Sequence, residues 1–179
     1  IYNTLIHLNA SGDLVAQYDK HHLVPFGEYV PLADFAAKFG IHGMAANDGI
    51  GFAAGAGKQL ISVRGLPTYL PMICYEAIFP GLAQSNEGRP EWLLHLTNDA
   101  WFGNFSGPQQ HLVQARARSI EQALPVAQAA NTGVSAMIDS YGRIVAAIPL
   151  NAAGFLDVAL PKGGAVTAYS RWGEAIWLV

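Results

Sequence analysis

Apolar runs separated by turn residues divide the chain into predicted strands and helices. Residues 1–8 and 13–20 alternate between apolar and polar positions around an Asn-Ala-Ser-Gly-Asp turn, which predicts a β-hairpin. Residues 31–40 have the pattern of a short helix that stops at Gly40. The Gly/Ala-rich stretch that follows, residues 41–58, has no period and is expected to be a long loop.

The middle of the chain predicts buried strands next to a helix. Residues 59–64 and 68–73 have the pattern of strands, and the second strand runs directly into Cys74. The segment EAIFPGLAQSN, which begins two residues after Cys74, starts as a helix. Residues 91–98 form a continuous apolar run, which is typical of a strand covered on both faces.

A long helix and four further strands are expected in the second half. Ser106 is a suitable N-cap, and the helix is expected to run to about residue 124 and to end at Pro125. Its predicted buried stripe consists of apolar residues at i, i+4, i+7 and i+11: Val113, Ala117, Ile120 and Leu124. The four strands are expected at 126–131, 134–140, 144–150 and 154–160. Strands interrupted by helices predict a layered α/β domain.

Composition narrows the range of functions. The 179 residues are enough for one domain with a sizeable core. At 51% apolar residues, 13% charged residues and a mean hydropathy of +0.22, the chain is more apolar than most soluble domains. A net charge of −3, with scattered Lys and Arg, gives no sign of a nucleic-acid partner. One cysteine excludes an internal disulfide framework, and the Cys and His spacings predict no metal site.

The two ends of the sequence suggest a segment of something longer. The first residues are already strand-like, and the last ones, from Trp172, begin an apolar run flanked by aromatic residues. Such a run suits either the interface end of a membrane helix or an amphipathic terminal helix. The sequence contains no complete apolar span of about 20 residues.

Cys74 has two opposite interpretations. A thiol at a strand end is usually a buried core sulfur, because free cysteine is among the most buried residue types. A nucleophile needs exposure at a turn, a helix N-terminus and a base, and the predicted change from strand to helix at Cys74 supplies the first two.

Several side chains are candidates for assisting the thiol. His95 or His111 would make a Cys–His pair, although His95 lies inside a buried strand pattern. Alternatively, Lys20 ends a strand and Glu28 follows it through a stretch made irregular by proline and glycine. A lysine and a carboxylate held in a rigid loop stabilise negative charge and relay a proton. These residues alone leave the choice open.

Four long segments, in order, resemble the carbon–nitrogen hydrolase (nitrilase) superfamily, and within it the bacterial apolipoprotein N-acyltransferases. They are YDKHHLVPFGEYVPL, ICYEAIFP, LTNDAWFG and QHLVQARARSIEQALPVAQAANTGVSAMIDSYGRI. The resemblance implies an α/β fold, a nitrilase-like α-β-β-α sandwich, with a Glu-Lys-Cys triad. Cys74 is then the nucleophile, Lys20 the triad lysine whose ammonium helps bind the oxyanion, and Glu28 an additional essential glutamate.

The same resemblance implies supporting and substrate-binding residues. Tyr75 and Glu76 complete the Cys-Tyr-Glu motif, and the backbone N–H of Tyr75 helps form the oxyanion hole. Trp101 belongs to a loop at the substrate entrance, and Phe102 and Asn98 are expected to contact substrate. The apolar loop 41–58, with Met44 and Phe52, is expected to act as a lid over the acyl chain.

The implied reaction is ping-pong acyl transfer at a membrane. Cys74 takes an acyl chain from a phospholipid as a thioester, and the N-terminal diacylglyceryl-cysteine of an apolipoprotein then accepts it. No cofactor is implied. The implied location is the bacterial inner membrane, with the catalytic domain facing the periplasm.

One departure from the family pattern concerns the general base. The family's base glutamate is expected before the hairpin that opens this chain, and neither Asp13 nor Asp19 lies in the matching motif. Residues 1–168 are therefore expected to be a carbon–nitrogen hydrolase domain without its N-terminal part, and 169–179 the start of a truncated C-terminal membrane helix. The 179-residue chain by itself is expected to be inactive.

Two other classes of function stay open at this point. A soluble amidase or nitrilase would share Cys74, Lys20 and Glu28 but act on small amides or nitriles. A non-catalytic nitrilase-like interaction domain is the other alternative, because the sequence contains no visible base. The Gly-x-Gly pairs at 49–51 and 55–57 do not lie between a strand and a helix, which disfavours a nucleotide site.

Overall fold

The computed structural model describes residues 1–32, 38 and 51–178. It divides into two compact units, Ile1–Gly57 and Lys58–Val179, which are described separately. Two expectations concern residues outside the described ranges: nearly all of the predicted helix at 31–40, and residues 41–50 of the predicted lid, including Met44.

The first unit is built on the predicted hairpin. Strands β1 (Thr4–Leu8) and β2 (Leu14–Asp19) pair antiparallel, from Thr4 opposite Asp19 to a bulge near the turn. The Asn9 side chain closes the turn by accepting hydrogen bonds from the N–H groups of Ser11 and Asp13, both at 2.9 Å. This local bonding is the usual role of asparagine in a turn, and it confirms the predicted hairpin.

Close backbone approaches in the first unit require glycine. The N–H of Gly55 donates to the carbonyl of Lys20 at 2.9 Å. A Cβ at Gly55 would lie 2.1 Å from the carbonyl oxygen of Asp19, and one at Gly51 would lie 2.7 Å from that of Glu28. The described part of the predicted loop therefore runs against the segment that carries Lys20 and Glu28, without forming a helix or strand of its own.

The second unit contains a five-stranded mixed sheet in the order β3-β4-β5-β6-β7. The strands β3, β4 and β5 are parallel, and β6 and β7 follow as antiparallel neighbours. The bounds are Tyr69–Ile73 (β3), Trp92–Asn98 (β4), Val126–Asn131 (β5), Ser135–Ile138 (β6) and Ile144–Ile148 (β7). Each strand lies within a predicted one.

Two predicted strands are wrong. Residues 59–64 form only an isolated bridge, Ile61 to Tyr69, because the chain turns back at Val63–Leu66, just before Pro67. Residues 154–160 form no strand, and the side chain of Phe155 is 84% exposed. An apolar run with no covered face has nothing to pair or pack with.

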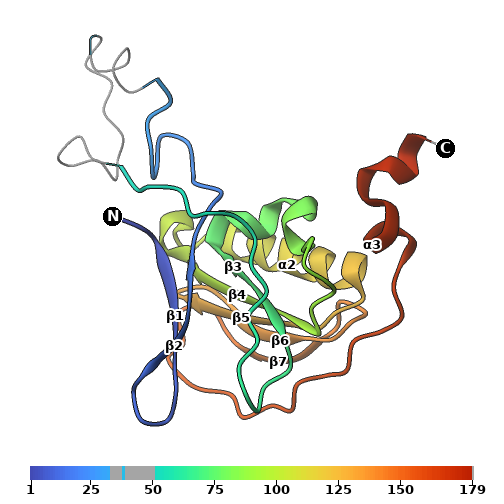
Figure 1. Cartoon of the computed structure of the whole chain (residues 1–179). Helices are drawn as coiled ribbons and strands as arrows, with labels where there is room; N and C mark the ends of the chain where they lie inside the picture. Colours follow the sequence, from blue (N-terminus) through green and yellow to red (C-terminus); the bar gives the residue numbers. More distant parts are fainter. Residues whose placement is uncertain (33–37, 39–50, 179) are drawn as a thin grey trace. The chain divides into compact units, whose positions relative to one another are not determined.

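Helical segments cover one face of this sheet. Figure 1 shows α2 (Gly107–Gln122) and the short 3-10 helix η1 (Cys74–Ile78) on the same side of the strands. The helices η2 (Pro80–Ala83) and η3 (Asp99–Phe102) follow η1 and β4. The core between these elements consists of Leu70, Met72, Ala77, Ala83, Leu93, Leu112, Ala115, Leu124, Val126, Ala136 and Ile138.

The predicted stripe is only partly buried: Leu124, just after the end of α2, lies in the core, but two other members do not. Ser106 is the N-cap residue as expected, although its side chain makes no capping hydrogen bond. Val113 and Ile120 are more than half exposed, whereas His111 and Arg118 are almost fully buried. The hydropathy pattern failed here because this helix turns polar side chains inward, where they bond to the backbone of η1.

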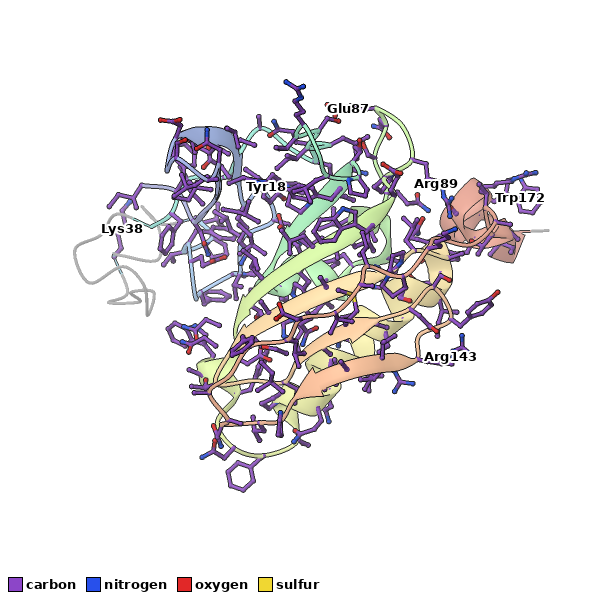
Figure 2. The ribbon with its side chains drawn as sticks, turned by 90° about the horizontal axis from the view of Figure 1, so that it is seen from below. Tyr18, Lys38, Glu87, Arg89, Arg143 and Trp172 are labelled. Carbon is purple, nitrogen blue, oxygen red and sulfur yellow. The ribbon has the colours of Figure 1, made fainter. Side chains whose placement is uncertain are left out.

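The end of the chain is helical but short. The helix α3 (Ala168–Trp172) is followed by the 3-10 helix η4 (Gly173–Leu178). Among the described helices, none combines the length and apolar character needed to cross a bilayer. Figure 2 shows Arg89 near this region, where its guanidinium bonds the carbonyls of Gln122 and Gly164 at 2.9 and 3.0 Å.

Candidate active site

Cys74 lies where the chain changes direction after β3. The strand before it is fully buried, and Cys74 begins η1 with a φ of +51°, in the left-handed region. A non-glycine residue pays roughly 1–2 kcal/mol to adopt this conformation, so the surroundings must hold it there. The thiol residue is half-buried. The strand-to-helix turn predicted for a nucleophile is present, although the helix is a single short 3-10 segment.

The Glu76 side chain stabilises the turn through a hydrogen bond to the backbone before Cys74. It is buried, and Oε2 accepts a hydrogen bond from the N–H of Ile73 at 2.8 Å. This contact reaches back across Cys74 and ties the start of η1 to the last residue of β3. Glu76 therefore supports the shape of the turn that presents the thiol.

Two histidine side chains converge on the carbonyl oxygen of Cys74. Nε2 of His95, from β4, lies 3.1 Å from this oxygen, and Nε2 of His111, from α2, lies 3.2 Å from it. The two rings contact each other edge to face, with centroids 4.9 Å apart. Both residues are buried, and neither makes the Cys–His pair considered from the sequence, because they bond the backbone of Cys74.

The Nδ1 atom of each histidine lies within hydrogen-bond distance of a second polar side chain. Nδ1 of His111 lies 2.8 Å from Oδ1 of the buried Asp99, which also accepts a hydrogen bond from Thr97. Nδ1 of His95 lies 3.1 Å from Oε1 of Gln128. Burial, together with the neighbouring His111, lowers the pKa of His95 to about 4, so that ring is neutral at pH 7.

Arg118 holds the other end of η1. One terminal nitrogen of its guanidinium donates to the carbonyls of Ala77 and Ile78 at 3.2 and 2.7 Å, and the other pairs with Glu121 at 2.6 Å. His111 and Arg118 are seven residues apart, two turns along one face of α2, so they reach the two ends of η1 together.

The expected substrate-binding residues lie at the carboxyl end of β4. Asn98 caps η3 by accepting from the N–H of Ala100 at 3.2 Å, and it also accepts from Asn131, its register partner at the end of β5. The Trp101 side chain is 67% exposed, and Phe102 packs its ring edge to face against His111. In parallel sheets, ligands bind beyond the carboxyl ends of the strands, which is where these residues and Cys74 lie.

The fully buried Lys20 and the half-buried Glu28 form an ion pair in the first unit. Nζ of Lys20 lies 2.7 Å from Oε2 of Glu28, which also accepts from the N–H of Val24 at 2.8 Å. The other oxygen, Oε1, accepts from Asn3 at 2.9 Å. Burial raises the pKa of Glu28, but these hydrogen bonds, led by the one from Lys20, outweigh it and hold the pKa below its ordinary value.

The two units thus each bring part of the predicted site together. The first contains the lysine–glutamate pair; the second contains the thiol, the Cys-Tyr-Glu motif and the residues after β4. Tyr75 is half-buried, and its ring packs edge to face on Phe79. No group of three or more His, Cys, Asp or Glu residues suitable for a metal occurs in the part of the chain that the structure describes.

Sequence reasoning missed Asp99, Gln128 and Arg118. Each is a polar residue, and each is buried. A polar residue directly after a buried strand, as Asp99 is after β4, is a signal that the sequence offered. Arg118 offered none, because its burial depends on which face of α2 turns inward.

Named proteins of similar sequence show the family of this chain. The chain is 49% identical over 173 residues to the apolipoprotein N-acyltransferase of Rhodopseudomonas palustris, and 47% identical over 173 residues to that of Bradyrhizobium diazoefficiens. Both matches cover 97% of this chain but 32% of the relative, so the chain spans about a third of their length. These matches confirm the resemblance read from the sequence.

A solved structure confirms the predicted fold class. A carbon–nitrogen hydrolase superfamily protein from Xanthomonas campestris superposes with a TM-score of 0.61 at 21% identity, covering 99% of this chain and 63% of the other. The family model described as carbon-nitrogen hydrolase matches residues 1–168. The chain therefore belongs to the carbon–nitrogen hydrolase family.

Proposed function

We propose that this chain is the catalytic segment of an enzyme that transfers an acyl chain from a phospholipid to the N-terminus of an apolipoprotein. The observation that carries the proposal is the 49% identity, over 97% of the chain, to a protein named apolipoprotein N-acyltransferase. The left-handed turn at Cys74 supports it, because such a turn presents a side chain that a regular strand or helix would not.

Cys74 acts as the nucleophile in this proposal. Its thiolate attacks the ester carbonyl of the phospholipid, and the negative charge moves to the carbonyl oxygen. The Lys20 ammonium and the N–H of Tyr75 stabilise that oxyanion. When the intermediate collapses, the C–O bond breaks, the lysophospholipid leaves with a proton from the base, and the acyl group stays on sulfur as a thioester.

The second half-reaction uses an amine. The α-amino group of a diacylglyceryl-cysteine attacks the thioester, the C–S bond breaks, and Cys74 is regenerated as the amide forms. A thioester suits this step because it stays reactive toward amines. Glu28 keeps Lys20 oriented through their 2.7 Å contact, which supports a role in binding the oxyanion.

The remaining assignments belong to the same proposal. Asn98, Trp101 and Phe102 contact the acyl donor, and Glu76 supports the nucleophile turn. Residues 1–168 form the hydrolase-type domain, and 169–179 begin a membrane helix of the complete protein. The enzyme lies in the bacterial inner membrane with this domain on the periplasmic face, and no cofactor, metal or nucleic acid takes part.

Thioester trapping tests the proposal. The full-length protein is incubated with phospholipid in the absence of apolipoprotein, and intact-mass and peptide mass spectrometry are used to locate an acyl adduct. We expect one acyl group on Cys74, and none in a folded Cys74→Ala variant. Hydrolysis of a small amide with no acyl adduct from phospholipid would favour the amidase alternative.

The general base gives a second test. The family's base glutamate is expected upstream of the opening hairpin, so we propose that the 179-residue chain alone does not turn over. Robust acyl transfer by the purified 179-residue chain would refute the assignment of the triad.

A further inference from the structure

The contacts of His95 and His111 with the carbonyl oxygen of Cys74 have no role in the chemistry described so far. Side chains from two separate elements, β4 and α2, are aimed at one backbone oxygen, with Nε2 distances of 3.1 and 3.2 Å. Both rings are buried, and both are anchored on their far side by Gln128 and Asp99. Burying so many polar groups is costly unless they are bonded, so this cluster has a specific arrangement to maintain.

His111 is the stronger of the two contacts. Its two ring nitrogens face two acceptors, the carbonyl oxygen of Cys74 and the carboxylate of Asp99. The ring satisfies both acceptors only when both nitrogens carry hydrogen. In that form the ring donates to the Asp99 carboxylate at 2.8 Å, and charge-assisted hydrogen bonds are about twice as strong as neutral ones.

His95 contributes a second, weaker contact. Gln128 donates through Nε2 to the carbonyl of Val134 at 2.9 Å, so its Oε1 faces His95. The pKa of His95, lowered to about 4, makes this ring neutral. A neutral ring has one N–H and serves one of its two acceptors at a time.

The held carbonyl belongs to the peptide unit that joins Cys74 and Tyr75. In a planar trans peptide, the C=O and the N–H point in opposite directions. Hydrogen bonds that hold the oxygen of Cys74 therefore set the direction of the N–H of Tyr75, on the other edge of the same peptide plane. Hydrogen bonding to the oxygen also polarises the peptide and strengthens its N–H as a donor, by about 10–30%.

We propose that His111, supported by Asp99 and assisted by His95, is a positioning residue that aims the Tyr75 N–H at the oxyanion of the acylation step. This inference rests on the proposed function, in which that N–H is an oxyanion donor. Loss of a complete oxyanion donor slows catalysis by about 10²–10³-fold. A misdirected donor retains part of its effect, so loss of the His111 contact slows thioester formation by roughly 10–100-fold.

The test compares two reactions of the same sulfur in the full-length enzyme. Thioester formation from phospholipid passes through an oxyanion. Alkylation by iodoacetamide does not, because sulfur displaces iodide at a saturated carbon. Both rates are followed on the Cys74 peptide by mass spectrometry, in single-turnover experiments at pH 7. The variants are His111→Leu, His111→Gln and His95→Leu, with the exposed neighbour Gln110→Leu as the control.

We expect His111→Leu to slow acylation at least 10-fold while alkylation stays within about twofold of wild type. His111→Gln, whose amide nitrogen can replace Nε2 as a donor, is expected to recover most of the rate, and His95→Leu to have the smaller effect. The Gln110→Leu control should match wild type in both reactions. Thermal unfolding identifies any variant that does not fold, and the glutamine variant then carries the comparison.

Three results would overturn the inference. An unchanged acylation rate in His111→Leu would show that the His111 contact with the Cys74 carbonyl has no catalytic effect. Parallel loss of acylation and alkylation would show that it positions the thiol and not the N–H. Equal loss in the leucine and glutamine variants would show that a donor to the carbonyl is not what matters. Failure of the proposed function looks different, because the wild-type enzyme would then form no acyl adduct at all.

Discussion

Replacing Glu28 by glutamine tests the energetics of the partly buried ion pair with Lys20 in the first unit. The substitution keeps the size of the side chain but removes the charge opposite Lys20, which is fully buried. Three hydrogen bonds end on the carboxylate, from Lys20, Val24 and Asn3. An amide presents one acceptor and one N–H₂ group, so at least one of these donors then faces another donor.

The expected loss of stability follows from these contacts. Removing one partner of a buried ion pair costs about 3–5 kcal/mol. The Glu28 side chain is 13% exposed, so solvent reaches it and the lower end applies, about 3 kcal/mol. For a chain of this size the corresponding fall in Tm is roughly 6–12 °C. Urea unfolding followed by circular dichroism measures the change in the free energy of unfolding.

The pH dependence gives the sharper part of this prediction. The pKa of Glu28 is lower in the folded state than in the unfolded state, so ionised Glu28 stabilises the fold. That contribution is complete above the unfolded pKa of about 4.3, and it is lost as the pH falls through the folded pKa. The stability gap between wild type and Glu28→Gln should therefore be constant from about pH 5.5 to 7 and narrow below pH 5.

A matched control separates this effect from general acid destabilisation. Asp157→Asn removes an exposed carboxylate and should change stability by less than 0.5 kcal/mol, on the order expected for surface sites, at every pH. A gap of under about 1 kcal/mol at pH 7 for Glu28→Gln would refute the assigned strength of the pair. A gap that stayed constant down to pH 3.5 would refute the pKa argument.

Three further substitutions test the packing of the second unit by urea unfolding. Gly133→Ala should destabilise the fold by about 1–3 kcal/mol, because the new Cβ would lie 2.3 Å from Oδ2 of Asp99. Gly154→Ala is the control, because its Cβ would have no neighbour nearer than 3.8 Å. Equal effects of the two substitutions would contradict the packing argument. Ala123→Gly should stabilise by about 0.5–1 kcal/mol, because Ala123 ends α2 at a φ of +48°, and a loss of stability would contradict this. Arg118→Met should destabilise the fold by about 2–4 kcal/mol, because it leaves the carbonyls at the end of η1 and the Glu121 carboxylate without their partner. A loss below about 1 kcal/mol would show that solvent replaces the guanidinium.

The sequence was sufficient for elements whose pattern depends on local chemistry. The hairpin follows from alternation and an asparagine turn, and β3 and β4 follow from apolar runs that end at polar residues. The long motifs were sufficient to identify the family. The expected role of each site residue comes from the resemblance and stays a prediction.

What the sequence could not predict depends on contacts between distant residues. Val113 and Ile120 looked like the buried face of α2, but His111 and Arg118 are buried because each bonds the backbone of η1. Hydropathy ranks residues by the cost of burying them without partners, and it has no information about partners 37 to 41 positions away. The strand predicted at 154–160 failed for the converse reason, since apolar residues there have no neighbouring strand.

Both ends of η1 are hydrogen-bonded to α2, which affects the order in which the domain folds. The left-handed turn at Cys74 is unfavourable by itself. The side chains that bond the two ends of η1 come from α2, which is made about 37 residues later. Loop closure over such a distance must precede the contacts, so the turn is acquired late in folding. In a newly made chain the Cys74 side chain is therefore not yet held in this turn, and it takes up its final orientation only once the domain around it is complete.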